Sequence, residues 1–286
     1  MGIKRFPEAD LHCHTTASDG LLTPYELIKA ASEIGLKAVG ITDHDTVSGW
    51  SESIKAGKEF GVEILKGIEL NTEWQGTEVH ILGYEPDQES KQFQDKLREL
   101  REARMKRMLK ILDRLHNMKI DISVSEIKAI AKGESVGRPH IAQALIQHGY
   151  AKSIKDAFTQ YIGAKAPAYV PRFKLAPKEG INLIREAGGV AVLAHPGQHD
   201  LGKFIQIWVN EGLQGVEISH SDHTPEEERQ YREISRKFHL IMTGGSDFHG
   251  EGRKMGVKLG GWGVSYDVVE QIRDLTICSR KKAEWN

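Results

Sequence analysis

The sequence predicts an α/β fold in which a barrel-like domain of βα units is interrupted by an all-helical insertion. Two observations support this fold class. Short β-branched runs alternate with helical stretches in the first and last parts of the chain, as in parallel βα units. Between about residues 88 and 163 the pattern is helical throughout. We therefore assign residues 1–87 to the first part of the barrel, 88–164 to the insertion and 165–286 to the second part.

The first part of the barrel is expected to open with a strand ending in "DLHCH", followed by the helix "TPYELIKAASEIG". In this helix Thr23 is expected at the N-cap and Pro24 at the first helical position, and Glu26 would complete a capping box with Thr23. Gly35 is expected to end the helix. The segments "KAVGIT", "VEILKGIEL" and "EVHILGY" are expected strands, and "TVSGWSESIKAGKEFG" is an expected helix.

The insertion is expected to begin with the long amphipathic helix "FQDKLRELREARMKRMLKILDRLHNM". Its apolar residues recur at three- and four-residue spacing and so share one face: Leu97, Leu100, Met108, Ile111, Leu112 and Leu115. The βα pattern then resumes with "PKEGINLIREAGG", "VAVLAHPG", "LQGVEISH", "PEEERQYREISRKFH" and "LIMTGGSDFHG". We prefer a closed barrel to an open sheet for these units.

Composition limits the possible functions. The chain has 286 residues, 39% of them hydrophobic, and a formal net charge of −1, so it has no overall attraction for nucleic acid or anionic membranes. Its two cysteines, Cys13 and Cys278, are far apart and fit a reducing compartment. The N-terminal residues contain no apolar signal region, and no run approaches the length of a spanning helix. We predict a cytoplasmic protein with no membrane association and no obligate protein partner.

Histidines and carboxylates gather where the predicted strands end. His12 and His14 are two residues apart in a strand and therefore share a face, with Cys13 on the other. The carboxyl ends of barrel strands converge on the active-site face, so these side chains are expected to meet. The full set is His12, His14, Asp19, His44, Glu69, His80, His195, Asp247 and His249.

Nine such groups are too many for a single ion that also keeps a position open for water. We therefore predict two or three divalent ions, with Glu69 able to bridge two of them through its two oxygens. Mixed imidazole and carboxylate ligation suits manganese, with iron or zinc as alternatives, better than magnesium or calcium.

The ordered motifs "DLHCHTTASDG", "GITDHDT", "GIEL", "VHILGY", "AHPG" and "GGSDFHG" resemble those of the PHP (polymerase and histidinol phosphatase) metallophosphoesterases. The likeness covers nearly the whole chain, including "VGRPHIAQAL" in the insertion. The sequence is most similar to the TrpH-like branch, whose members are nucleoside 3′,5′-bisphosphate phosphatases that also trim short 5′-phosphorylated RNA. Histidinol phosphatases and polymerase PHP domains resemble only the ligand motifs.

The resemblance implies a distorted seven-stranded, TIM-like (β/α)7 barrel with three ligand groups. One ion would bind His12, His14, Glu69 and Asp247, a second Glu69, His80 and His195, and a third Asp19, His44 and His249. All nine positions carry the residue type that the family pattern requires.

Such a centre predicts hydrolysis by metal-bound hydroxide, because coordination lowers the pKa of water towards ~7. The leaving oxygen needs a proton or a metal. Asp43 and Asp45, which flank His44, are candidate catalytic groups, and orientation of the histidine or capping of the loop is the alternative role that we rank first for Asp43.

Substrate contacts are predicted for a few basic residues. Arg138 opens a predicted helix, where a guanidinium and free N–H groups can bind phosphate. Lys165, Arg172, His220 and His223 are weaker candidates. One basic run is interpreted as a solvated helix face and is also the one patch that could follow RNA: Arg98, Arg101, Arg104, Lys106, Arg107, Lys110 and Arg114.

These inferences predict a metal-dependent phosphoesterase that acts on nucleoside 3′,5′-bisphosphates or on the 5′ end of short RNA. Two alternatives are a phosphatase for a small metabolite such as histidinol phosphate and a non-catalytic nucleic-acid-binding or scaffolding module whose metals only stabilise the fold. The near-neutral charge argues against the second alternative.

Overall fold

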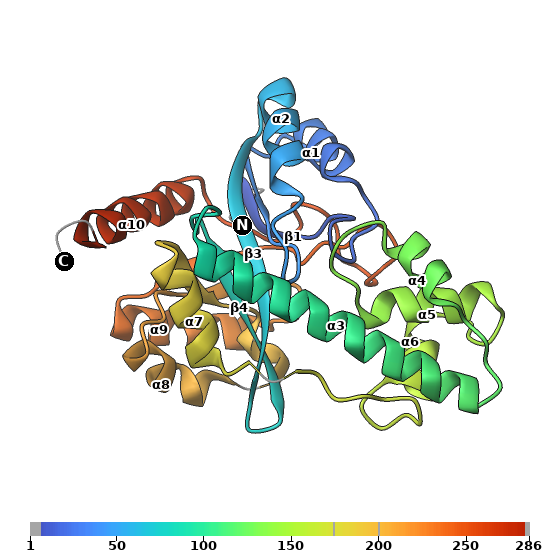
Figure 1. The fold of residues 1–286 in the computed structure, drawn as a ribbon. Helices are drawn as coiled ribbons and strands as arrows, with labels where there is room; N and C mark the ends of the chain where they lie inside the picture. Colours follow the sequence, from blue (N-terminus) through green and yellow to red (C-terminus); the bar gives the residue numbers. More distant parts are fainter. Residues whose placement is uncertain (1–6, 174, 200, 284–286) are drawn as a thin grey trace.

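The computed structural model describes residues 7–173, 175–199 and 201–283, with the backbone alone for 278–283 (Figure 1). Seven strands form one sheet whose spatial order follows the chain order. The strands are β1 (Ala9–Cys13), β2 (Ala38–Ile41), β3 (Glu63–Trp74), β4 (Thr77–Tyr84), β5 (Val190–Leu193), β6 (Gly215–Ser219) and β7 (Ile241–Gly244).

The sheet curves into a nearly closed barrel. Just beyond β7 the N–H of Asp247 donates to the carbonyl of His12 at 2.9 Å, and the N–H of His14 donates to the carbonyl of Phe248 at 2.9 Å. These bonds join the chain just after β7 to β1, so the two edges of the sheet meet beside His12, His14 and Asp247. Gly245 allows this approach, because a Cβ at that position would lie 2.3 Å from the Cβ of His12.

Strand β4 differs from the expectation of parallel βα units. It pairs antiparallel with both β3 and β5, while the other neighbouring strands pair parallel. A tight turn joins β3 to β4 through Gln75 and Gly76, both with positive φ. The reversal matters for His80, because the first half of an antiparallel strand lies at the same end of the barrel as the carboxyl ends of its parallel neighbours.

Helices cover the outside of the barrel. They are α1 (Pro24–Glu33), α2 (Trp50–Phe60), α7 (Pro177–Glu186), α8 (Ile205–Asn210), α9 (Pro225–Phe238) and α10 (Asp267–Ala283), with short 3₁₀ turns at Pro196–His199 and Leu201–Phe204. The predicted start of α1 is confirmed. The Thr23 hydroxyl accepts from the Glu26 N–H at 3.2 Å, and the Glu26 carboxylate accepts from the Thr23 N–H at 2.8 Å.

Between β4 and α7 the described chain is helical and extends to the right in Figure 1. Its elements are α3 (Lys91–Asn117), α4 (Val124–Ala131), α5 (Arg138–Gln147), α6 (Ile154–Ala157) and a π-helical turn at Phe158–Ile162. This segment has its own apolar cluster, which includes Met108, Leu115, Ile141 and Leu145. Helix α3 runs across the front of the barrel, so its first half contacts the barrel and its second half packs in the helical segment.

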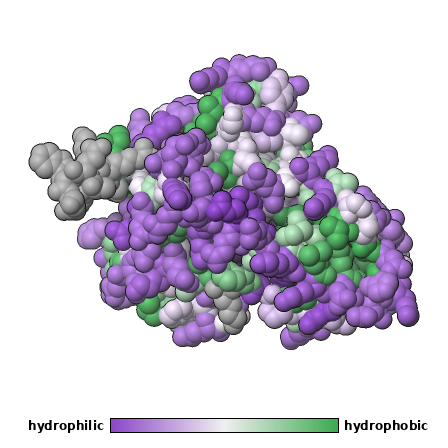
Figure 2. All heavy atoms as spheres, viewed as in Figure 1, coloured by the Kyte–Doolittle hydropathy of each residue, from purple (hydrophilic) through white to green (hydrophobic). Residues whose placement is uncertain are grey.

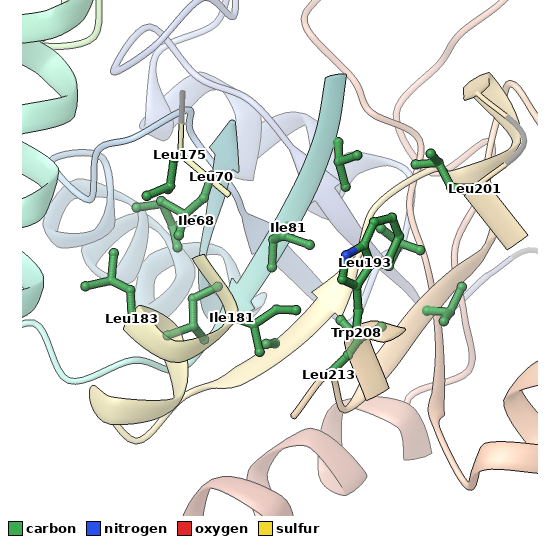
Figure 3. Packing of buried hydrophobic residues seen from close by; sticks show 14 of the residues in the cluster. Ile68, Leu70, Ile81, Leu175, Ile181, Leu183, Leu193, Leu201, Trp208 and Leu213 are labelled. Carbon is green, nitrogen blue, oxygen red and sulfur yellow. The ribbon is translucent and has the colours of Figure 1, made fainter. Parts of the chain in front are cut away.

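The largest core cluster lies between the barrel and helices α7 and α8. Figure 3 shows Ile68, Leu70 and Ile81 of β3 and β4 beside Ile181 and Leu183 of α7. Burial of each such side chain stabilises the fold by about 1.5–3 kcal/mol. This packing holds β3 and β4, the two strands that carry Glu69 and His80.

The face shown in Figure 2 is mostly hydrophilic along α3, with an apolar area over the helical segment. Within the described ranges, no helix combines the length and apolar character needed to cross a membrane. Cys13 is a buried free thiol, and the side chain of Cys278 lies outside the described residues.

Candidate metal centre

Glu69 lies in the middle of a group of imidazoles at one end of the barrel. Its side chain is 1% exposed. Oε2 is 3.2 Å from His14 Nε2 and 3.0 Å from His44 Nδ1. Oε1 is 2.6 Å from His80 Nδ1 and 3.1 Å from His195 Nε2. The two oxygens therefore face different sets of imidazoles, which is the arrangement that a carboxylate bridging two ions requires.

Asp247 completes one group of ligand atoms. Its Oδ1 lies 3.5 Å from His12 Nε2 and 3.4 Å from His14 Nε2, and with Glu69 these residues offer atoms within 4.8 Å of one another. Asp247 has a φ of 57°, a left-handed conformation that few non-glycine residues adopt. This turn after β7 directs the carboxylate back towards β1.

A second group surrounds Asp19, in the loop after β1. The Oδ1 atom of Asp19 lies 3.3 Å from His249 Nε2, and the rings of His249 and His14 stack with centroids 4.0 Å apart. His249 Nδ1 is 2.9 Å from the carbonyl oxygen of Asp247, to which it donates, so Nε2 keeps its lone pair for an ion. His44 belongs to the same group. The third group consists of Glu69, His80 and His195.

The donor set fits divalent metal ions. Several of its buried atoms form no hydrogen bond within the described chain: His12 Nε2, His14 Nδ1 and Nε2, Asp19 Oδ1 and Glu69 Oε2. Leaving one such group without a partner costs about 1–3 kcal/mol. Ions held by imidazole and carboxylate would satisfy His12 Nε2, Asp19 Oδ1, Glu69 Oε2 and one nitrogen of His14, whose other nitrogen carries a proton. Such mixed ligation is typical of manganese, iron and zinc.

Beside these groups lies a set of four arginines, Arg104, Arg107, Arg138 and Arg172, which we call the arginine cluster. All four line one small cavity with Gly137 at the start of α5. Arg104 and Arg172 face carboxylates: Arg104 Nε lies 2.6 Å from Asp45 and Arg172 Nη2 lies 2.9 Å from Glu78.

The other two members of the arginine cluster donate to backbone carbonyls. Arg107 Nε donates to Val170 at 2.8 Å, and Arg138 Nη1 donates to Ile162 at 3.4 Å. Burial, together with the like charges of Arg138 and Arg172, lowers the pKa of Arg107 to about 9. The cluster thus has more positive charge than its carboxylate neighbours balance, and a bound anion would relieve this repulsion.

Two polar side chains connect the arginine cluster to the metal-ligand groups. The Glu78 Oε1 atom lies 2.7 Å from His80 Nε2 and also faces Arg172. Asn71 accepts from Arg172 and places its Nδ2 3.2 Å from His44 Nδ1. An anion bound by the arginine cluster would therefore be separated from the metal-ligand groups by a single side chain, that of Glu78 or Asn71.

Comparison with known proteins defines the family. The family model described as "PHP domain" matches residues 10–166, more than half of the chain. The chain belongs to the PHP domain family. Among curated relatives, the 5′-3′ exoribonuclease of Haemophilus influenzae is 34% identical over 84% of this chain and 89% of the relative. The 3′,5′-nucleoside bisphosphate phosphatase of Chromobacterium violaceum is 30% identical over 85% and 87%.

A solved structure agrees with this result. The protein from Bifidobacterium adolescentis, assigned as a metal-dependent phosphoesterase, superposes with a TM-score of 0.88 at 33% identity and covers 93% of this chain and 96% of that one. The expected fold, a seven-stranded barrel of the PHP type, is confirmed. The antiparallel β4 is the one departure from parallel βα units in the sheet of the described chain.

The structure of this PHP chain brings all nine predicted ligands together, and each belongs to at least one of the groups described above. Of the predicted substrate contacts, Arg138 and Arg172 lie in the arginine cluster. Lys165 is exposed on the turn after the π-helical segment, and the structure describes no contact between it and the cluster.

The prediction of substrate contacts for the two histidines after β6 needs correction. His223 is held by the backbone: its Nδ1 is 2.7 Å from the Ile218 carbonyl oxygen, and its Nε2 accepts from Gly197 at 3.1 Å. Both ring nitrogens are therefore occupied. His220 is fully buried, and its ring centroid lies 6.1 Å from that of His12, so it offers no surface to a substrate.

The geometry of Asp43 and Asp45 favours orientation over proton transfer. Asp43 is 1% exposed and accepts from the Thr15 N–H, the Thr15 hydroxyl and the Ser18 hydroxyl at 2.6–2.8 Å. It thus orders the loop that carries Asp19. Asp45 forms the ion pair with Arg104 and so anchors the arginine cluster.

The basic run on α3 is not one solvated face. Lys106 and Lys110 are exposed, but Arg101 donates to the Asp45 carbonyl, and Arg104 and Arg107 point into the arginine cluster. Sequence reasoning also missed Glu78 and Glu217. Both had a detectable signal: Glu78 shares a strand face with His80, and Glu217 interrupts an apolar strand.

Binding of a divalent ion such as manganese is expected to weaken as the pH falls. Burial opposes a charge on His14, but Asp247 and Glu69 outweigh it and raise the pKa of His14 to about 10. Glu69 and Glu78 likewise outweigh burial and raise the pKa of His80 to about 9. Below these values each imidazole must release a proton to bind an ion, so acid competes with metal.

The number of protons released can be measured by calorimetric titration with manganese in two buffers of different ionisation enthalpy. At about pH 7 the heats should differ between the buffers, because both imidazoles start protonated. Equal heats in the two buffers would contradict this protonation state.

Proposed function

We propose that this PHP chain removes the 3′-phosphate from nucleoside 3′,5′-bisphosphates and releases nucleotides from the 5′ end of short 5′-phosphorylated RNA. The observation that carries the proposal is the arginine cluster beside the metal-ligand groups. Two of its guanidinium groups donate only to backbone carbonyls among their described contacts. A substrate with two separate phosphates matches a centre that cleaves one phosphate and a cluster that holds the other.

The same geometry accounts for both activities named among the relatives. A nucleoside 3′,5′-bisphosphate is the smallest fragment that carries the 5′-phosphate and the 3′-phosphate ester of a 5′-phosphorylated RNA. In both substrates the bond that breaks joins phosphorus to the 3′-oxygen. Water supplies the new oxygen on phosphorus, and the leaving 3′-oxygen gains a proton. The arginine cluster would bind the 5′-phosphate in each case.

The residues present fit two or three divalent ions, and we propose manganese as the metal, with iron and zinc as alternatives. The ions would be held by the three ligand groups, with Glu69 shared between two of them. When bound, such ions lower the pKa of water and stabilise charge on phosphoryl oxygens. Glu78 would hold His80 with Nδ1 towards the ions, since its own oxygen lies at Nε2.

The proposal is tested by measuring phosphate or nucleotide release from four substrates with manganese-loaded protein: adenosine 3′,5′-bisphosphate, 5′-phosphorylated short RNA, adenosine 3′-monophosphate and histidinol phosphate. We expect turnover of the first two to exceed that of the monoesters and to stop in a chelator. Turnover of histidinol phosphate alone would replace the proposal with a small-metabolite phosphatase. RNA binding without turnover would indicate a binding module.

A further inference from the structure

Strand β6 places a fully buried carboxylate, Glu217, behind the metal centre. The Glu217 Oε1 atom lies 3.1 Å from His12 Nδ1, and Oε2 accepts a hydrogen bond from the backbone N–H of His195 at 2.9 Å. These two histidines belong to different ligand groups. Glu217 itself belongs to neither of those groups, and it has no role in the proposed function.

His12, Glu217 and His220 could be considered as a further ion site, because they offer ligand atoms within 4.8 Å of one another. Their hydrogen bonds argue against this. The Asp222 N–H donates to His220 Nδ1 at 3.1 Å, so His220 carries its proton on Nε2. A protonated nitrogen cannot bind a metal. His220 Nε2 instead faces Asp247 Oδ2 at 3.8 Å, as a donor directed towards that carboxylate.

For His12 the contact with Glu217 selects the tautomer. A carboxylate accepts, so the imidazole proton lies on Nδ1 and the lone pair lies on Nε2. Nε2 is the atom that faces Glu69 Oε2 at 3.4 Å and Asp247 Oδ1 at 3.5 Å. Without Glu217 the ring could turn or carry its proton on the nitrogen that an ion needs.

For His195 the contact with Glu217 stabilises an unusual backbone. His195 has a φ of 26°, in the positive range that few non-glycine residues adopt. Such a conformation persists when its surroundings hold it. The bond from its N–H to Glu217 is one such restraint, and it keeps His195 Nε2 3.1 Å from Glu69 Oε1.

We infer that Glu217 is a positioning residue that holds ligands of two ion positions at once, so that a single carboxylate sets the affinity of the chain for two neighbouring divalent cations. This inference rests on the proposed metal centre. Removing a carboxylate behind a metal-binding histidine commonly lowers metal affinity by 10–100-fold. A residue that supports two positions should affect both ions.

The test compares manganese binding by wild type and Glu217→Gln, using calorimetry and metal analysis. Glutamine keeps the size of the side chain but has a single oxygen, which cannot replace both acceptors. We expect about 10–100-fold weaker binding of two ions and a lower kcat. The KM for the bisphosphate should stay unchanged, because the arginine cluster is intact. Glu217→Asp, which keeps the charge with a shorter reach, should show a smaller loss.

Tyr84→Phe is the matched control. Tyr84 is also fully buried, and its hydroxyl donates to the Leu11 carbonyl at 3.0 Å. Removing this bond should lower the melting temperature but leave manganese affinity unchanged, which separates a loss of stability from a loss of positioning. Wild type that binds none of manganese, iron and zinc would refute the proposed metal centre and with it the proposed function. Wild type that binds manganese no more tightly than folded Glu217→Gln would refute the inference alone.

Discussion

Replacing Glu69 with glutamine is expected to abolish turnover of every substrate. Glu69 faces four imidazoles within 3.2 Å through two separate oxygens, and an amide has only one oxygen with which to bridge ions. Ions contribute several kcal/mol to transition-state stabilisation, and each 1.4 kcal/mol is a factor of ten in rate. The kcat/KM should therefore fall by at least about 1000-fold, with fewer ions bound per chain.

Glu63→Gln provides the control for this substitution. Glu63 lies on the same strand but contacts Tyr266, at 2.5 Å, outside the metal centre. It should keep wild-type activity and metal content. Rates and metal content are measured on the same samples. A Glu69→Gln protein with full activity and a normal metal content would refute the assignment of Glu69 as a ligand.

Replacing Arg138 with alanine is expected to raise the KM for adenosine 3′,5′-bisphosphate and leave the KM for adenosine 3′-monophosphate nearly unchanged. Arg138 is half-buried and donates to a carbonyl, so its charge is available to a phosphate. Hydrogen bonds to charged groups contribute about 1.5–3 kcal/mol, which corresponds to an increase in KM of roughly 10–100-fold. Arg107→Ala should have the same effect.

Lys110→Ala tests whether this effect needs the arginine cluster or only positive charge. Lys110 is exposed on the same helix as Arg107. Lys110→Ala removes one positive charge, as Arg138→Ala does. It should change the KM for adenosine 3′,5′-bisphosphate by less than about twofold, because exposed charges interact weakly. Equal effects of Arg138→Ala on both substrates would make Arg138 a structural residue.

The sequence predicted that the nine proposed ligands lie together, as they do in the structure, and the reason is geometric. Residues two apart on a strand share a face, and the ends of parallel strands meet, so His12, His14, Asp247 and their partners could be brought together without coordinates. The antiparallel course of β4 was missed. Both faces of β3 and β4 are largely buried, so they show no clear alternation, and the turn at Gln75 and Gly76 was the remaining signal.

The arginine cluster could not be predicted in full. Arg104 and Arg107 come from α3, Arg138 from the start of α5 and Arg172 from the return to the barrel. Sequence spacing places residues on one helix face, but it does not show which face of α3 packs towards the site. The basic run was therefore interpreted as solvated. Manganese as the metal, the domain boundaries and the cytoplasmic location remain predictions.

The central claim is that the metal centre cleaves the 3′-phosphate while the arginine cluster holds the 5′-phosphate. The most direct test is to incubate manganese-loaded protein with adenosine 3′,5′-bisphosphate and identify the nucleotide product by chromatography. We predict adenosine 5′-monophosphate and one equivalent of phosphate, with no product after the metal is removed. Adenosine 3′-monophosphate as the product, or turnover that survives metal removal, would contradict the claim.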